Sequence, residues 1–177
     1  LSLQNVHGEA SIFNGILNGK NLEGQMGNSR AHHGTLRLGL AGNDAPFRLE
    51  TAINADLAQL PPILKRLVDN QTFLEELALI EDLEGKGEGR LEVKKSQDRI
   101  NTNVAVRKFN LSTRYQRIFW PLEIDQGTFS YDENRISAAN LVGRLGKSSF
   151  SKLSVWLDRK ENNDLKNEYD SNPQAKE

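Results

Sequence analysis

Most of the apolar residues in this chain alternate with polar residues along the sequence. The alternation is clear in the segments Leu36–Leu40, Phe47–Ile53, Leu91–Val93, Ile100–Val106 and Leu153–Leu157. A period of two places successive side chains on opposite faces of a strand, so each segment has one apolar and one polar face. Antiparallel sheets with one solvated face have this pattern, whereas buried parallel strands do not. The pattern therefore predicts a mainly β fold.

One stretch in the middle of the chain has helical periodicity instead. Leu57–Val68 contains Pro61 and Pro62 near its start, where proline is tolerated in a first helical turn, and then apolar residues at helical spacing. Thr72 and Glu75 fit a capping box that opens a second helix. We therefore expect short helices at residues 60–69 and 72–79, inserted between two β-rich halves.

A short glycine motif recurs along the chain. Asn21–Ser29 aligns with Asn140–Ser148, and weaker copies of the same string begin at Asn5 and Asp82. Glycine within a strand marks a bulge, a bend or a close backbone approach, and a repeated bulge would curve the sheet in the same sense at several places. The alternative is chance recurrence of a short string. The glycines expected to have a structural role are Gly24, Gly27, Gly85, Gly143 and Gly146.

Composition and charge narrow the function classes. The 23 basic and 24 acidic side chains nearly balance, which argues against a general nucleic-acid binder. The absence of cysteine excludes disulfides, thiolate metal sites and thiol nucleophiles. No apolar run is long enough for a transmembrane helix, and no signal peptide pattern is present.

The two ends of the chain suggest its organisation. The first residue, Leu1, suggests that an upstream portion of a larger protein precedes this chain. The last twenty residues contain ten charged side chains and little that could be buried, which is typical of a loose segment. We therefore expect one β module at residues 1–157, followed by a polar tail or linker at residues 158–177.

Three candidate chemical sites are not supported by their patterns. Gly143–Ser148 ends like a phosphate-binding loop, but two residues separate its glycines where four are needed. His32 and His33 are adjacent, so on a strand they would point to opposite faces unless a bulge intervened, which favours surface residues over a metal site. The acidic cluster Glu75–Glu84 lacks the regular loop of an EF-hand and is typical of a solvated helix end. We expect no catalytic residue, metal or cofactor.

A further segment, Arg107–Trp120, interleaves basic and aromatic side chains. Sites for single-stranded nucleic acid combine the same residue types. The balanced charge of the chain favours a simpler interpretation, an amphipathic strand whose arginines reach solvent.

Several glycine-punctuated segments together resemble a known family. They are Asn21–Ser29, Gly34–Gly39, Ala45–Phe47, Ile53–Leu57, Leu60–Pro62, Leu83–Leu91 and Gly143–Phe150. On these segments the chain resembles the C-terminal, repeat-bearing region of AsmA-like proteins of the Gram-negative envelope, the AsmA, YhdP and TamB type. The resemblance covers about residues 1–157. It implies a curved, elongated antiparallel sheet that forms an open groove with an apolar lining, in a periplasmic parent protein anchored in the inner membrane.

The resemblance also implies a function and a site. The function is non-enzymatic, a contribution to phospholipid transport or outer-membrane biogenesis, with lipid acyl chains and other segments of the parent chain as partners. The candidate groove residues are Leu36, Leu38, Leu40, Phe47, Leu49, Ile53, Ile100, Val104, Val106, Leu153 and Val155.

Two alternatives to lipid handling stay open at this point. One is a structural or adaptor module whose apolar face is filled by the helical insert, through Ile63, Leu67 and Phe73. The other is a glycan-binding or glycan-cleaving domain in which Trp120 or Trp156 lies beside two carboxylates.

Overall fold

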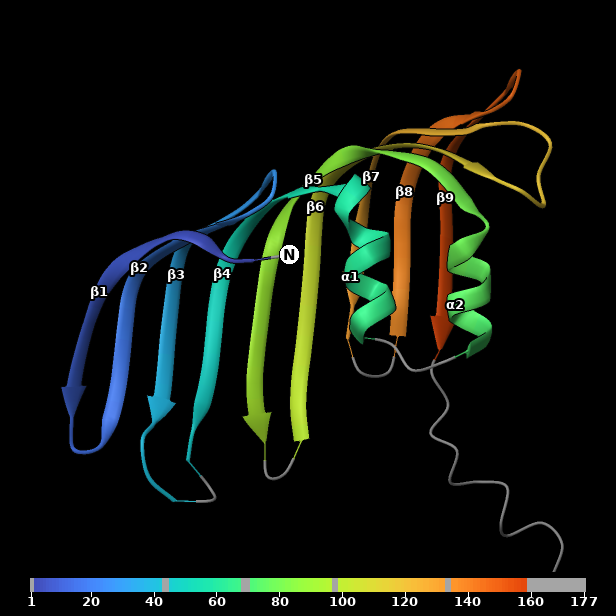
Figure 1. Ribbon diagram of the computed structural model, residues 1–177. Helices are drawn as coiled ribbons and strands as arrows, with labels where there is room; N and C mark the ends of the chain where they lie inside the picture. Colours follow the sequence, from blue (N-terminus) through green and yellow to red (C-terminus); the bar gives the residue numbers. More distant parts are fainter. Residues whose placement is uncertain (1, 43–44, 68–70, 97–98, 133–134, 159–177) are drawn as a thin grey trace, which may run out of the picture.

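A computed structural model describes residues 2–42, 45–67, 71–96, 99–132 and 135–158. Nine strands form one open antiparallel sheet, in which each strand pairs with its neighbours in sequence (Figure 1). The strands are β1 (Gln4–Phe13), β2 (Ile16–Met26), β3 (Ser29–Gly39), β4 (Phe47–Asp56), β5 (Ile80–Ser96), β6 (Arg99–Tyr115), β7 (Leu122–Tyr131), β8 (Arg135–Leu145) and β9 (Ser148–Asp158). The predicted mainly β, antiparallel fold is confirmed.

The helical insert lies between β4 and β5, where the sequence predicts it. A 3-10 turn, η1 (Leu57–Gln59), leads into α1 (Leu60–Leu67), and α2 (Gln71–Ala78) precedes β5. The side chain of Asp56 caps η1 by accepting a hydrogen bond from the backbone N–H of Ala58 at 3.1 Å. The predicted last turn of the first helix, residues 68–69, and the predicted tail beyond residue 158 lie outside the described residues.

Tight hairpins connect several neighbouring strands. Asn14 and Gly15, between β1 and β2, both have positive φ (48° and 71°), as a type I′ turn requires. The turns after β2 and β8 begin instead with a single glycine of positive φ, Gly27 (58°) and Gly146 (60°), as type II′ turns do. These two turn types match the twist of paired strands, so each of the three turns joins neighbouring strands directly.

The recurring sequence motif is a β-bulge. Its first residue has positive φ in all four copies: Asn5 (50°), Asn21 (50°), Asp82 (50°) and Asn140 (54°). The cross-strand register shifts at each of these residues. Asparagine and aspartate tolerate the left-handed region better than other non-glycine residues, which explains their place in the motif. His33 (53°) and Lys152 (56°) form similar bulges without it.

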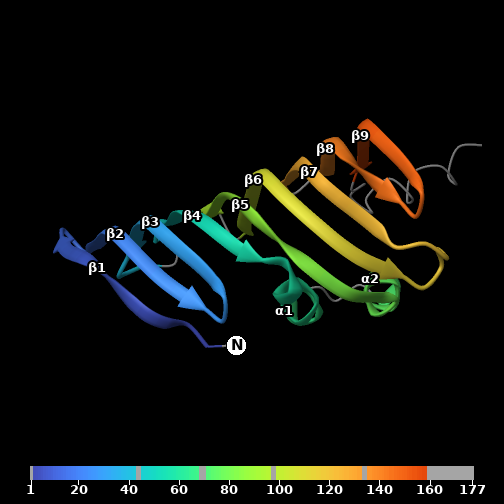
Figure 2. The ribbon, with the colours of Figure 1, turned by 90° about the horizontal axis from the view of Figure 1, so that it is seen from above.

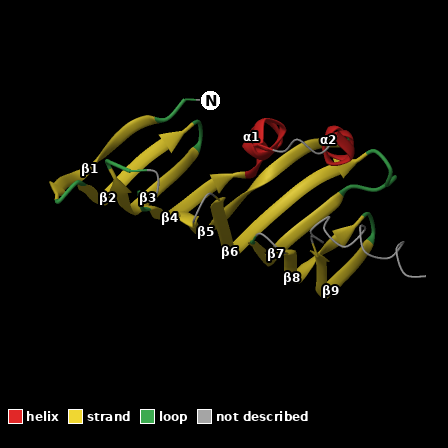
Figure 3. Ribbon diagram, turned by 90° about the horizontal axis from the view of Figure 1, so that it is seen from below, coloured by secondary structure: helices red, strands yellow, loops and turns green. Residues whose placement is uncertain are grey.

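The sheet is bent along a line that crosses the strands (Figures 1 and 2). Asn21, His33, Asn140 and Lys152 lie within their strands rather than at the ends. Because a bulge bends and twists its strand locally, these positions account for the bend. The helices α1 and α2 lie on the inner side of the bend, near the ends of β4 and β5 (Figures 1 and 3).

Candidate functional site: an apolar face inside the bend

The strand register brings the predicted groove residues onto one face of the sheet. Leu36 lies opposite Leu49, and Leu38 lies opposite Phe47. Directly paired residues share a face, so these four side chains are neighbours. The register continues this face across the sheet through Ile53, Ile100, Val104, Val106, Leu153 and Val155.

Leu40 is the exception among the predicted groove residues. It lies one residue beyond the end of β3, and its backbone N–H donates to the carbonyl oxygen of Gly15 at 2.8 Å. The strand ends there because the N–H of Gly39 donates a hydrogen bond to the carbonyl oxygen of Pro46 at 2.7 Å, where the chain turns towards β4. The assignment of Leu40 to the alternating strand is therefore wrong.

Burial shows that this face is the inside of the bend. Every buried residue of the described strands belongs to it: Gly19, Gly24, Gly34, Thr51, Gly87, Thr113, Ile124, Gly127, Leu141 and Gly143. Large apolar side chains are few in this set, and the most buried is Leu141, which is 4% exposed. We call this surface the inner face and the opposite surface the outer face.

The inner face is open to solvent at the edges of the sheet, and most of its large apolar side chains between the edges are half-buried. Ile100 is 69% exposed, and Leu153, Val155 and Ile12 are also exposed. All nine described strands belong to the same sheet, so none of them forms a second layer against it. Exposed apolar area costs about 25 cal/mol per Å², and a large contiguous apolar patch marks an interaction site. The inner face is therefore suited to an apolar ligand or partner.

The motif glycines lie where side chains would collide. A Cβ added to Gly85 would lie 2.2 Å from the carbonyl oxygen of Asn110, and one added to Gly143 would lie 2.1 Å from that of Glu123. A Cβ at Gly24 would lie 3.2 Å from the side chain of Leu3. Gly27 and Gly146 occupy hairpin turns with positive φ. Gly85 and Gly143 thus allow neighbouring strands to approach closely inside the bend.

Several residues of the inner face were not predicted from the sequence. They lie mainly on β2, β7 and β8, and include Leu17, Leu22, Ile124, Phe129, Ile136 and Leu141. The signals that could have located these strands are the Asn14-Gly15 pair, which favours a hairpin, and the bulge motif itself.

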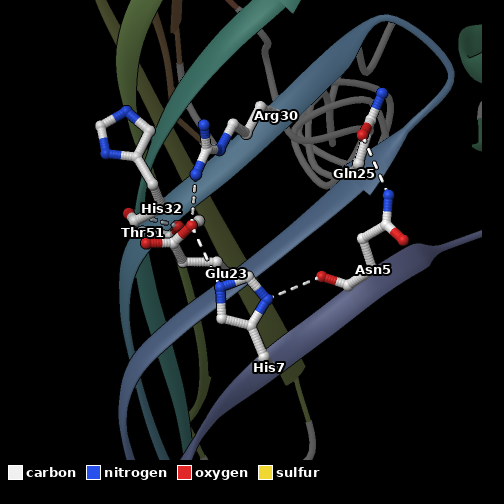
Figure 4. Close-up of polar contacts among 7 residues, drawn as sticks. All are labelled: Asn5, His7, Glu23, Gln25, Arg30, His32 and Thr51. Carbon is white, nitrogen blue, oxygen red and sulfur yellow. Dashed lines mark hydrogen bonds and ion pairs between the residues drawn. The ribbon is translucent and has the colours of Figure 1, made fainter.

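The outer face is charged, and its side chains pair across strands. Glu23 on β2 accepts a hydrogen bond from Arg30 on β3 at 2.5 Å and lies 3.4 Å from His7 on β1 (Figure 4). The hydrogen bond from Arg30 lowers the pKa of Glu23. Glu50 is likewise paired with Arg90 and Arg48, and the hydrogen bond from Arg90 lowers its pKa. The two faces therefore differ sharply in character.

The adjacent histidines meet because of a bulge. His33 is the bulge residue, so the alternation that would separate the pair is interrupted, and the two ring centroids lie 4.8 Å apart. His32 and His33 line an open depression of about 570 Å³ that also includes Glu50, Arg90 and Arg107. Among the described residues, no three histidine or carboxylate side chains are grouped closely enough to hold a metal ion.

Glu76 on α2 is tied to the end of β6, which corrects two predictions. Arg117 donates to its carboxylate at 2.6 Å and 3.2 Å, and the hydroxyl of Tyr115 donates to it as well. Glu76 is thus ion-paired although its side chain is still 40% exposed, and Glu81, Asp82 and Glu84 of the same cluster lie on β5 rather than at a helix end. In addition, β6 ends at Tyr115, so Arg117 and the aromatic residues after it lie in a loop and not on an amphipathic strand.

This contact predicts a pH-dependent attachment of α2. The hydrogen bonds from Tyr115 and Arg117 lower the pKa of Glu76 below its ordinary 4.5. The stabilisation is therefore complete above that value and is lost as pH falls through the lowered folded pKa. Glu76→Gln should increase hydrogen exchange in α2 near pH 7, and the difference from wild type should shrink as pH falls below 4.5. Glu75→Gln, on the same helix, is the control, and an undiminished difference at low pH would contradict the assignment.

Comparison of the chain with family models, curated proteins and solved structures finds no match. The AsmA-like resemblance therefore stays a prediction from the sequence. Within the described residues, no helix has both the length and the apolar character needed to cross a membrane.

Proposed function

We propose that this chain is a non-enzymatic segment of a lipid-handling protein and that its inner face holds acyl chains. The observation that carries the proposal is the apolar inner face, which extends over strands β1 to β9, is half-buried on the central strands and is exposed at the edges of the sheet. Water-exposed Ile, Leu and Val side chains gain from contact with hydrocarbon, and each methylene of a bound acyl chain contributes ~0.8 kcal/mol.

The dimensions of the sheet suit a long apolar ligand. Neighbouring strands lie about 4.8 Å apart, so nine strands give an inner face about 40 Å long in the direction across the strands. The sheet bends around this face along its length and leaves it open on one side, while the charged residues lie on the outer face. An acyl chain lying along the bend would contact several strands in succession.

The resemblance to AsmA-like proteins supports the same function. We therefore place the chain in phospholipid transport or outer-membrane biogenesis, as a periplasmic portion of a parent protein held in the inner membrane. Lipid acyl chains and other segments of that parent are the partners that this proposal requires.

The second candidate is an adaptor module whose inner face is covered by protein. It is favoured by the position of α1 and α2 on the inner side of the bend and by Leu77 on α2, which is buried. The side chains of Ile63, Leu67 and Phe73, which this alternative requires, lie outside the described residues.

Photo-crosslinking along β6 tests the proposal. A crosslinking amino acid placed at Thr102, Val104 or Val106 faces the inner side, whereas one at Asn103 or Ala105 faces the outer side. Mass spectrometry after irradiation in cells should detect lipid adducts from the first set and not from the second. If the inner positions capture only protein, the adaptor function is correct, and equal lipid capture from both faces would contradict a specific site.

A further inference from the structure

The loop between β6 and β7 carries an exposed apolar patch. Phe119 is 91% exposed, Trp120 is 54% exposed, and Ile118 is also exposed. The two rings contact each other edge to face, with their centroids 5.4 Å apart. Contiguous exposed aromatic side chains of this kind mark a contact surface.

The patch is held in place rather than carried on a loose loop. The N–H of Ile118 donates to the carbonyl oxygen of Tyr115 at 2.8 Å, and the N–H of Gly146 donates to that of Pro121 at 3.1 Å. Trp120 lies against the β8–β9 turn, because a Cβ at Gly146 would be 2.4 Å from its indole ring. The loop therefore presents its aromatic side chains in a fixed arrangement.

The patch lies at one end of the inner face. Thr113 and Leu122, which flank the loop on β6 and β7, are paired directly and belong to the inner face. Lys147 is exposed in the turn that Trp120 contacts. At this end of the sheet the aromatic patch therefore lies between the apolar inner face and the cationic side chain of Lys147.

We propose that the loop Ile118–Trp120 is a membrane-contact site at which lipid reaches the inner face. This inference rests on the proposed lipid-handling function. Tryptophan has an apolar body and a polar N–H, and it is enriched at the boundary between hydrocarbon and headgroups. Lys147 would lie near the headgroup phosphates, and the inner face begins directly beside the loop, at Thr113 and Leu122. A protein partner at the same patch is the alternative that the experiment must separate.

The two tryptophans of the chain allow a direct test. Trp156→Phe leaves Trp120 as the fluorescent reporter, and Trp120→Phe leaves Trp156, which is exposed on β9 and faces the outer side. With vesicles of phosphatidylethanolamine and phosphatidylglycerol, Trp120 emission should shift to shorter wavelength and be quenched by brominated lipids, whereas Trp156 emission should not change. An unresponsive Trp120, or an equal response from both tryptophans, would overturn the inference.

A double substitution separates this inference from the proposed function. Phe119→Ser with Trp120→Ser should weaken vesicle co-sedimentation by about tenfold or more. It should leave lipid adducts at Val104 intact when the phospholipid is supplied in detergent micelles. Unchanged co-sedimentation overturns the membrane-contact site alone. If the chain that keeps Phe119 and Trp120 gives no lipid adducts from a crosslinker at position 104, while Trp120 responds to vesicles, the proposed function alone is overturned.

Discussion

Replacing Gly85 with alanine is expected to lower the free energy of unfolding by roughly 2–4 kcal/mol. Gly85 has a φ of 139°, a backbone conformation that residues with a side chain rarely adopt. In addition, an added Cβ would lie 2.2 Å from the carbonyl oxygen of Asn110. Relief requires β5 and β6 to separate, because the colliding atom belongs to the backbone. Urea unfolding followed by circular dichroism measures the change.

Gly87 provides the matched control on the same strand. Its φ is outside the left-handed region, and an added Cβ would meet no atom closer than 3.5 Å. Gly87→Ala should therefore be neutral or stabilise the chain by up to about 1 kcal/mol, through the reduced entropy of the unfolded chain. Equal destabilisation by the two substitutions would show that the collision at Asn110 is not what makes Gly85 necessary.

The second large effect is expected at Leu141. This side chain is 4% exposed and lies directly opposite Leu153, which is 44% exposed. Leu141→Ala removes buried hydrocarbon and should cost about 2–4 kcal/mol, whereas Leu153→Ala should cost less than about 1 kcal/mol. Thermal and urea unfolding of both variants would measure the difference.

The two substitutions also distinguish residues that stabilise the sheet from residues that are free to bind a ligand. Leu153→Ala should keep the fold while weakening lipid capture near β9. If Leu153→Ala destabilises the chain as much as Leu141→Ala, then its side chain is covered, and the open inner face at this edge is contradicted.

Uninterrupted alternation was sufficient to predict part of the sheet. Apart from Leu40, the predicted segments that contain Leu36, Phe47, Leu91, Ile100 and Leu153 lie on strands. Their alternation matches the two faces of the sheet because no bulge falls within them. The helical insert was also predictable, since its apolar spacing changes from two to about 3.6.

The strands that escaped prediction are those that a bulge divides. In β8, Ile136 and Ala138 lie on the inner face, and the bulge at Asn140 then places Leu141 and Gly143 on that same face. A strict period of two from Ile136 would have assigned Asn140, and not Leu141, to the inner face. The alternation therefore fails within one strand even though the inner face is continuous.

The remaining features depend on tertiary contacts. Glu76 and Arg117 are 41 residues apart and meet because β5 and β6 are paired. The exposure of Phe119 and Trp120 follows from the point at which β6 ends. Nor does an alternating pattern distinguish an apolar face that another layer covers from one that stays open.

The bulges have a further consequence for how such a sheet can vary. Asn21 and His33 lie next to each other on adjacent strands, as do Asn140 and Lys152. The position of the bulges within the strands determines where each strand bends, and so determines the profile of the bent sheet. The number of hairpins determines how long the sheet is in the direction across the strands. A further hairpin carrying the motif would join at β1 or β9, the two edges of the sheet, and repeat the same profile. Length and profile are therefore independent variables, which evolution or design can change one at a time.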